Sequence, residues 1–119
     1  MLLGSTGGFG HGSKIEHSMI GEVAYTLADR QIVTDDTPGE EYPATIRKQL
    51  MATSPSATEI ADRGEAISTA IKALKAGDTL LVAGRGHEQV QYYADYEKTL
   101  DDVTEVRAAV RNLHIGGME

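Results

Sequence analysis

The residues with the clearest potential for chemistry lie at 84–88, where an apolar run of strand length ends in Gly-Arg-Gly-His-Glu. Such a run, bounded by turn residues, predicts a buried strand of an α/β sheet, and ligands bind beyond the carboxyl ends of such strands. Gly84 and Gly86 would let a ligand approach the backbone. Arg85 offers a planar fork to a carboxylate or phosphate, and Glu88 can accept from an ammonium group. A plain strand-to-loop turn with solvated charges is the alternative interpretation.

Two other loops are expected at the same edge of the sheet. Residues 4–14 are rich in glycine, but they miss the phosphate-loop pattern because no glycine directly precedes Lys14 and no Ser or Thr follows it. We expect this loop to close over a ligand or a neighbouring domain. Residues 35–41 are a turn by composition, in which Asp36 contacts a substrate amine or makes a structural hydrogen bond. A solvated acidic turn remains the alternative there.

Strands and helices alternate along the chain, which predicts a Rossmann-like, three-layer α/β domain with a mostly parallel sheet. Strands are expected at 1–3, 31–34 and 58–61 and in the run that ends at Ala83, with an antiparallel hairpin formed by 89–93 and 97–100. Parallel strands end at one edge of a sheet, so the three loops should converge. That convergence predicts a single site.

Four helices are expected to pack on this sheet, each through an apolar face. In chain order the faces are Met19, Val23 and Leu27, widened by Ile20 and Ala24; Ile46 and Leu50, after Pro43; Ile67, Ile71 and Leu74, ended by Gly77; and Val103, Val106 and Val110. Capping boxes are predicted at 62–65 and 102–105, with Asp101 as a further cap, and 114–119 is expected to be a frayed tail.

Composition limits the classes of function. The 119 residues suit one domain, and a formal net charge of −7 without a basic cluster argues against nucleic-acid binding. Cysteine is absent, and no apolar run approaches the length needed to span a bilayer. We therefore expect a soluble, cytoplasmic protein without membrane association. No metal site is expected, because His11 and His17 lack ligands at a useful spacing, and His87 is interpreted as a hydrogen-bonded loop residue.

Five segments taken together resemble the C-terminal domain of the Mur ligases, in particular the members that add the third residue of the muramyl peptide. In chain order they are 4–8 (GSTGG), 19–24 (MIGEVA), 28–38 (ADRQIVTDDTP), 61–71 (ADRGEAISTAI) and 77–88 (GDTLLVAGRGHE). The resemblance implies that residues 1–119 form a domain that binds the incoming amino acid, meso-diaminopimelate or L-lysine, and closes over the active site. The central ATPase domain and the N-terminal UDP-binding domain of the family would be absent from this chain.

The resemblance also implies a reaction and a set of site residues. In the family, ATP and magnesium, bound mainly by the central domain, convert the D-glutamate carboxylate of a UDP-muramyl dipeptide to an acyl phosphate, which the incoming amine attacks. Alone, this chain would not turn over, so no catalytic residue is expected in it. Gly84 and Glu88 would contact the far end of a diaminopimelate side chain, whereas Asp36, Thr37 and Gly39 occupy the family's Asp-Asn-Pro-Arg motif.

Two departures from the family pattern affect the expected specificity. Thr37 stands where the family has Asn, and Gly39 stands where diaminopimelate-adding members have Arg, so the choice between diaminopimelate and lysine stays open. Lys14, Arg85 and His87 are possible accessory contacts. A stand-alone, non-catalytic Rossmann-like module that binds a small zwitterion or a protein partner is the alternative function. A folylpolyglutamate synthetase-type domain fits the 35–38 and 84–88 segments less well.

Overall fold

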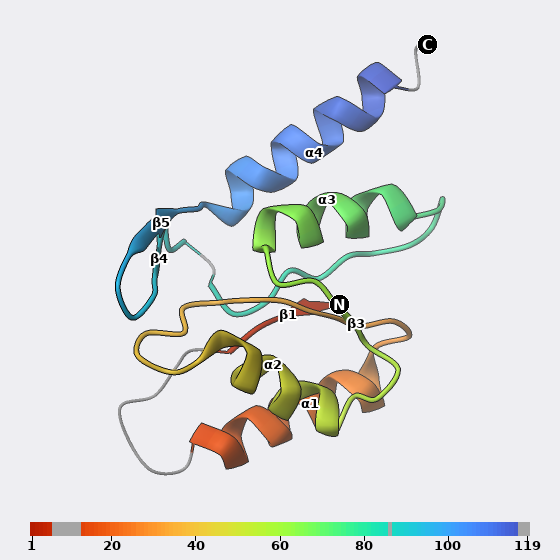
Figure 1. The fold of residues 1–119 in the computed structure, drawn as a ribbon. Helices are drawn as coiled ribbons and strands as arrows, with labels where there is room; N and C mark the ends of the chain where they lie inside the picture. Colours follow the sequence, from red (N-terminus) through yellow and green to blue (C-terminus); the bar gives the residue numbers. More distant parts are fainter. Residues whose placement is uncertain (6–12, 86, 117–119) are drawn as a thin grey trace.

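A parallel sheet forms the middle layer of the computed structural model, which describes residues 1–5, 13–85 and 87–116 (Figure 1). Strands β1 (Leu2–Leu3), β2 (Ile32–Val33) and β3 (Thr58–Glu59) pair in that order, with Leu2 opposite Ile32 and Ile32 opposite Thr58. Their carboxyl ends therefore lie at one edge, as predicted. The strand expected before Gly84 joins the free side of β1 through one parallel bridge between Leu2 and Val82.

The 80–83 segment is less buried than its apolar sequence predicts. Leu2 N–H donates to Leu81 O at 2.9 Å, and Ala83 N–H donates to Leu2 O at 3.0 Å. No further strand of the described chain pairs with the other side of this segment, so it forms a sheet edge. Leu81 is consequently exposed and Val82 only half-buried. The prediction of a buried strand is wrong for this reason, although the parallel pairing is confirmed.

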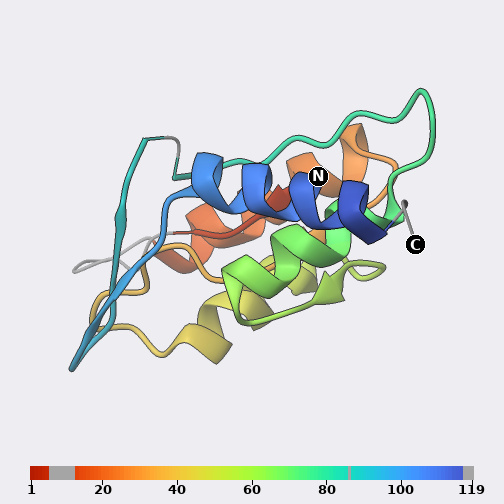
Figure 2. The same cartoon turned by 90° about the horizontal axis from the view of Figure 1, so that it is seen from above.

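Helices cover both faces of the sheet, which confirms the three-layer α/β class. Helices α1 (Ser13–Leu27) and α2 (Pro43–Ala52) cover one face, and α3 (Arg63–Ala73) and α4 (Asp102–Gly116) cover the other (Figure 1). Figure 2 shows α3 and α4 side by side, with a hairpin at one end of the molecule. That antiparallel hairpin consists of β4 (Val90–Tyr92) and β5 (Glu97–Thr99), close to its predicted position. None of the described helices is long and apolar enough to cross a membrane.

Two apolar clusters hold the layers together, one on each face of the sheet. Successive residues of a strand point to opposite faces, so Leu2 packs in one cluster and Leu3 in the other. The cluster on the α3–α4 side consists of Leu2, Ala66, Ile67, Ala70, Ile71 and Ala109. The cluster on the α1–α2 side consists of Leu3, Ala24, Val33, Ile46 and Leu50. The predicted inward faces of α2 and α3 are confirmed, apart from Leu74.

Helix α1 turns only the edge of its predicted apolar face to the core: Ile20 and Ala24 pack there as predicted, but the centre of the stripe does not. Met19, Val23 and Leu27 are 60%, 53% and 80% exposed, whereas Ala24 is fully buried. The reason is close packing on α2 through Gly21. A Cβ at this glycine would lie 2.2 Å from Leu50 O, so the two helix backbones approach closely and small residues occupy the contact. The larger apolar side chains are thereby turned to solvent.

The ends of α3 and α4 also differ from the predictions. Helix α3 ends before Leu74, which is its C-cap and is partly exposed, and Gly77 lies in a later turn with φ +90°. On α4, Val103 and Val110 are exposed, and Ala109 is the buried residue. Val106 alone of the predicted stripe packs against the cluster on the α3–α4 side, so the prediction is confirmed there and wrong for Val103 and Val110. The helix continues to Gly116, through part of the predicted tail, and 117–119 lie outside the described residues.

One predicted cap is confirmed and the other is corrected. Asp62 accepts a hydrogen bond from Glu65 N–H at 2.8 Å at the start of α3, as its spacing predicted. At α4 the cap is Asp101, which accepts from Thr104 Oγ1 at 2.6 Å. Asp102 instead points inward and pairs with a buried arginine. The sequence pattern places two acids at this terminus without indicating which one faces solvent.

Candidate functional site

The predicted convergence of loops is confirmed around Asp36. A Cβ at Gly4, just after β1, would lie 2.7 Å from Thr34 O and 2.8 Å from Asp36 N. A Cβ at Gly84 would lie 2.6 Å from Asp36 Oδ2. Three segments that follow parallel strands therefore meet with no room for another side chain at either glycine. The rest of the first loop, residues 6–12, and Gly86 lie outside the described residues.

The carboxyl group of Asp36 lies in a nearly buried position surrounded by charge. Burial raises the pKa of Asp36 above its ordinary value, and the guanidinium groups of Arg63 and Arg85 oppose this increase. The nearby acids Glu88 and Asp102 act in the same direction as burial. A side chain of the hairpin donates a hydrogen bond to the backbone carbonyl of Asp36. This carboxyl group is therefore buried and electrostatically coupled to the 84–88 loop.

The hairpin supplies a site residue that the sequence did not reveal. Gln91 on β4 is fully buried, and its Nε2 donates to Asp36 O at 2.6 Å and to Asp35 O at 3.4 Å. Its Oε1 has no hydrogen-bond partner among the described residues. In the sequence, Gln91 is a polar residue within a predicted strand, and nothing in the strand pattern assigns a function to it. The hairpin therefore positions the Asp36 loop in addition to extending the domain.

Arg85 lies inside the loop and not at its surface. It is 2% exposed, and Nη2 donates to Leu100 O at 2.5 Å and Glu88 O at 3.0 Å. Nη1 donates to Thr37 Oγ1 at 3.2 Å and Val90 O at 3.3 Å. The expectation that Arg85 offers its fork to a ligand is therefore wrong. Both Nη atoms donate to protein oxygens, three of them within or beyond the hairpin side of the loop, whereas Nε has no hydrogen-bond partner among the described residues. The guanidinium therefore holds the 84–88 loop in shape.

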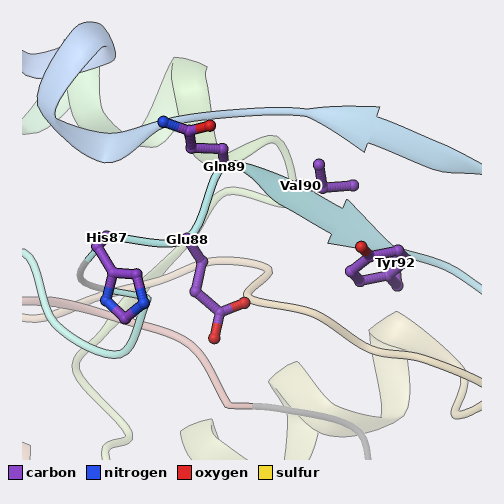
Figure 3. Close-up of a pocket in the computed structure, with 5 residues that line it drawn as sticks. All are labelled: His87, Glu88, Gln89, Val90 and Tyr92. Atoms are coloured by element: carbon purple, nitrogen blue, oxygen red, sulfur yellow. The ribbon is translucent and has the colours of Figure 1, made fainter.

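Glu88 and His87 are the exposed polar groups of this loop. They line an open depression of about 510 Å³ together with Gln89, Val90 and Tyr92 (Figure 3). In Figure 3 the side chains of His87 and Glu88 point to one side of the segment, and that of Gln89 points to the other. The charge of Glu88 also raises the pKa of Asp36, so the carboxyl groups of these two residues lie close enough to interact. The arrangement can accept hydrogen bonds from an ammonium group.

The remaining predicted contacts have different environments. Thr37 is half-buried and accepts from Arg85, so its hydroxyl helps to connect the two loops. Gly39 has φ +61° and donates its N–H to Tyr92 O at 2.8 Å. A backbone in this region favours glycine, which gives a local reason for the residue found there. Lys14 lies in the first turn of α1, and its side chain is outside the described part of the structure.

A second buried arginine lies directly beneath the site. Arg63 is fully buried in the first turn of α3, and its Nε and Nη2 each donate to the carboxylate of Asp102 at 2.8 Å. Nη1 donates to Asp35 O at 3.2 Å, and Nη2 donates to Ala83 O at 3.0 Å. No sequence pattern predicted this pair, because a charged residue beside a helix cap is ordinarily solvated.

The described residues bear on whether this site could hold a metal ion or a phosphate. No group of three or more His, Cys, Asp or Glu side chains in the described ranges could hold a metal ion. Arg63 and Arg85 are buried and directed at protein oxygens, so neither is presented to a phosphate. What the described edge offers to a ligand is the exposed carboxylate of Glu88, next to the exposed backbone of Gly84.

Comparison with known proteins relates this geometry to a family. The family model described as "Mur ligase, glutamate ligase domain" matches residues 1–86. UDP-N-acetylmuramoyl-L-alanyl-D-glutamate--2,6-diaminopimelate ligase of Rhizobium meliloti is 47% identical over 104 residues, which are 87% of this chain and 21% of that protein. The enzyme of the same name from Brucella melitensis is 48% identical over 101 residues, 85% of this chain and 21% of that protein.

The fold comparison agrees with the sequence comparison. A solved structure of a UDP-N-acetylmuramoyl-L-alanyl-D-glutamate--2,6-diaminopimelate ligase superimposes with a TM-score of 0.79 at 30% identity. It covers 95% of this chain and 23% of that chain. The present chain thus spans about a fifth of the length of the curated relatives that it matches.

Proposed function

The chain belongs to the Mur ligase family, and on this premise we propose that residues 1–119 act as the C-terminal domain of such a ligase and bind the amino acid that it adds. The observation that carries the proposal is the contact of Gly84 with Asp36 at the carboxyl edge of the sheet, beside the exposed carboxylate of Glu88. This edge is where α/β sheets bind ligands. The stand-alone binding module is not favoured by the family match.

The proposed ligand is a diamino acid, meso-diaminopimelate or L-lysine. The names of the relatives support diaminopimelate. The charges at the described edge support the recognition of an amine, because Glu88 exposes its carboxylate there and no arginine of the described chain presents its donors outward. Asp36 adds a second, buried carboxyl group that is electrostatically coupled to Glu88. Glu88 would accept from the ammonium group at the far end of the side chain. Asp36, Thr37 and Gly39 would border the ligand on the opposite loop.

The domain would contribute orientation to the reaction. In the proposed ligation, the ligase joins the amino group of the bound amino acid to the D-glutamate carboxylate of a UDP-muramyl dipeptide. Holding the far end of the amino acid would fix the direction in which its reacting amine points, which lowers the entropic barrier to attack. ATP and magnesium would activate the carboxylate and would be held mainly by the central domain of such a ligase.

Calorimetry with the purified chain tests this assignment. We expect meso-diaminopimelate or L-lysine to bind, and L-norleucine, which lacks the terminal amine, not to bind. Glu88→Ala should weaken binding by about tenfold or more, because a hydrogen bond to a charged group contributes about 1.5–3 kcal/mol. Glu97→Ala is the matched control, since Glu97 is an exposed acid on β5, in the hairpin that follows the loop of Glu88.

Three results would contradict the proposal. Equal affinity of Glu88→Ala and the parent chain would remove Glu88 from the site. Equal affinity for L-norleucine and L-lysine would exclude recognition of the amine. Failure of the folded parent chain to bind either diamino acid would show that this domain does not carry the amino-acid site by itself.

A further inference from the structure

We propose that Arg63 is a positioning residue whose guanidinium, held by Asp102, sets the separation between the loop that carries Asp36 and the loop that carries Gly84. The inference rests on the proposed function, because these two loops border the proposed amino-acid site. Arg63 itself contacts no ligand in this proposal. It acts through the backbone of the two loops.

The carbonyl groups that Arg63 binds are placed to have this effect. Nη1 donates to the carbonyl oxygen of Asp35, the residue before Asp36, at 3.2 Å. Nη2 donates to the carbonyl oxygen of Ala83, the residue before Gly84, at 3.0 Å. One planar, rigid group therefore bridges the ends of two strands that β1 separates in the sheet. The fixed geometry of the guanidinium determines how closely the two loops approach.

Arg63 holds the two loops so close that little further movement between them is possible. A Cβ at Gly84 would lie 2.6 Å from Asp36 Oδ2, so the loops touch at the residues that follow the bound carbonyls. An arginine fork can hold two carbonyls and a carboxylate together, whereas a lysine ammonium is a single point on a flexible stem. Loss of the fork should therefore release one or both loops even if the positive charge is kept.

Asp102 orients the guanidinium and compensates its charge. Both Asp102 oxygens accept from Arg63 at 2.8 Å, on the side of the guanidinium that leaves Nη1 free for Asp35. An unpaired arginine would be costly in this buried position. Because Asp102 begins α4 and Arg63 begins α3, the starts of both helices are tied to the edge of the sheet that carries the site.

Arg47 provides a matched control, because it is bound to the same loop in a different way. It is mostly buried and pairs with Asp35, but through the side-chain Oδ1 at 2.6 Å, and its Nε donates to Glu59 at 2.9 Å. Its hydrogen bonds and ion pairs go to Asp35 and Glu59, and none goes to residues 83–85 of the described chain. Arg47→Lys thus removes a comparable fork without removing the bridge between the two loops.

The test compares Arg63→Lys with Arg47→Lys by amide NMR spectra of the ligand-free chain, urea unfolding and calorimetric titration with meso-diaminopimelate and L-lysine. We expect Arg63→Lys to shift the Asp36 and Gly84 amide resonances together and to weaken amino-acid binding by about tenfold or more at full occupancy of the folded state. Arg47→Lys should leave the Gly84 resonance in place and change affinity less than twofold. A fall in affinity that follows the loss of stability equally in both variants would overturn the inference.

A second variant covers the case in which Arg63→Lys fails to fold. Asp102→Glu keeps both charges and displaces the guanidinium, so it should shift the same two resonances; an unchanged Gly84 resonance would overturn the inference. The ligand-free spectra also separate this inference from the proposed function. Coupled shifts of Asp36 and Gly84 without amino-acid binding by the parent chain would retain the positioning role and refute the binding proposal. Binding by the parent chain without coupled shifts would do the reverse.

Discussion

Comparing alanine substitutions at Gly84 and Gly77 measures the free-energy cost of one close contact. Both have positive φ, +108° and +90°, so an alanine at either position should lose about 1–2 kcal/mol to backbone strain. They differ in their surroundings. A Cβ at Gly77 would meet nothing within 4 Å, whereas a Cβ at Gly84 would lie 2.6 Å from Asp36 Oδ2. The difference between the two variants therefore reports the contact with Asp36.

The additional cost at Gly84 follows from how little Asp36 can move. Asp36 is a short side chain and only 3% exposed, so relief of the contact requires a change of its rotamer or a shift of a loop. Overpacking of this kind costs about 1–3 kcal/mol. We therefore expect Gly84→Ala to be destabilised by about 2–5 kcal/mol in total and Gly77→Ala by about 1–2 kcal/mol.

Urea unfolding of the two variants measures this difference. At a slope of about 2 kcal/mol per molar urea, an extra 1–3 kcal/mol lowers the midpoint of Gly84→Ala by roughly 0.5–1.5 M relative to Gly77→Ala. In the background of Asp36→Ala the extra cost should disappear, because the opposing oxygen is gone. Equal midpoints for the two glycine variants would refute the close approach of the two loops, and with it the geometry from which the site was built.

Two further predictions concern charge and packing. The raised pKa of Asp36 means that its contribution to stability is fully present below the unfolded value of about 3.9 and is lost as the pH rises through the folded pKa. Asp36→Asn should therefore be more stable than the parent chain at pH 7, with the difference shrinking toward pH 4; a difference independent of pH would contradict this. Leu50→Ala should cost about 2–5 kcal/mol in urea unfolding, because Leu50 is fully buried. Leu27→Ala should stay within about 0.5 kcal/mol, and similar losses in both would contradict the orientation of α1.

The parts of the fold that depend on local patterns could be predicted from the sequence. Alternating apolar runs and helical periodicity gave the order of the elements and the hairpin. The meeting of Gly4, Asp36 and Gly84 also followed, because the carboxyl ends of parallel strands share an edge. The topology alone brings these three residues together, whatever their individual contacts.

The orientation of α1 and the burial of the arginines depend on partners that are remote in sequence. On α1 several stripes carry apolar residues, and the contact of Gly21 with Leu50 O decides which of them faces inward. Arg85 is interpreted from its type as a ligand contact, but Leu100 O lies within reach of its Nη2 and binds it inside the protein. No periodicity in the sequence identifies a carbonyl group as the partner of a distant side chain.

The central position of β1 has a consequence for the order in which the chain folds. Leu2 pairs with Ile32 on one side and with Val82 on the other, and Leu2 and Leu3 anchor the apolar clusters on the two faces of the sheet. The unit of β1, α1, β2, α2 and β3 can assemble through neighbouring segments, whereas the pairing with Val82 must close a loop that contains nearly all of that unit. Contacts between residues so distant in sequence slow folding. We therefore expect the loop that carries Gly84 and Glu88 to take its final place late, on an edge that the first half of the chain has already formed.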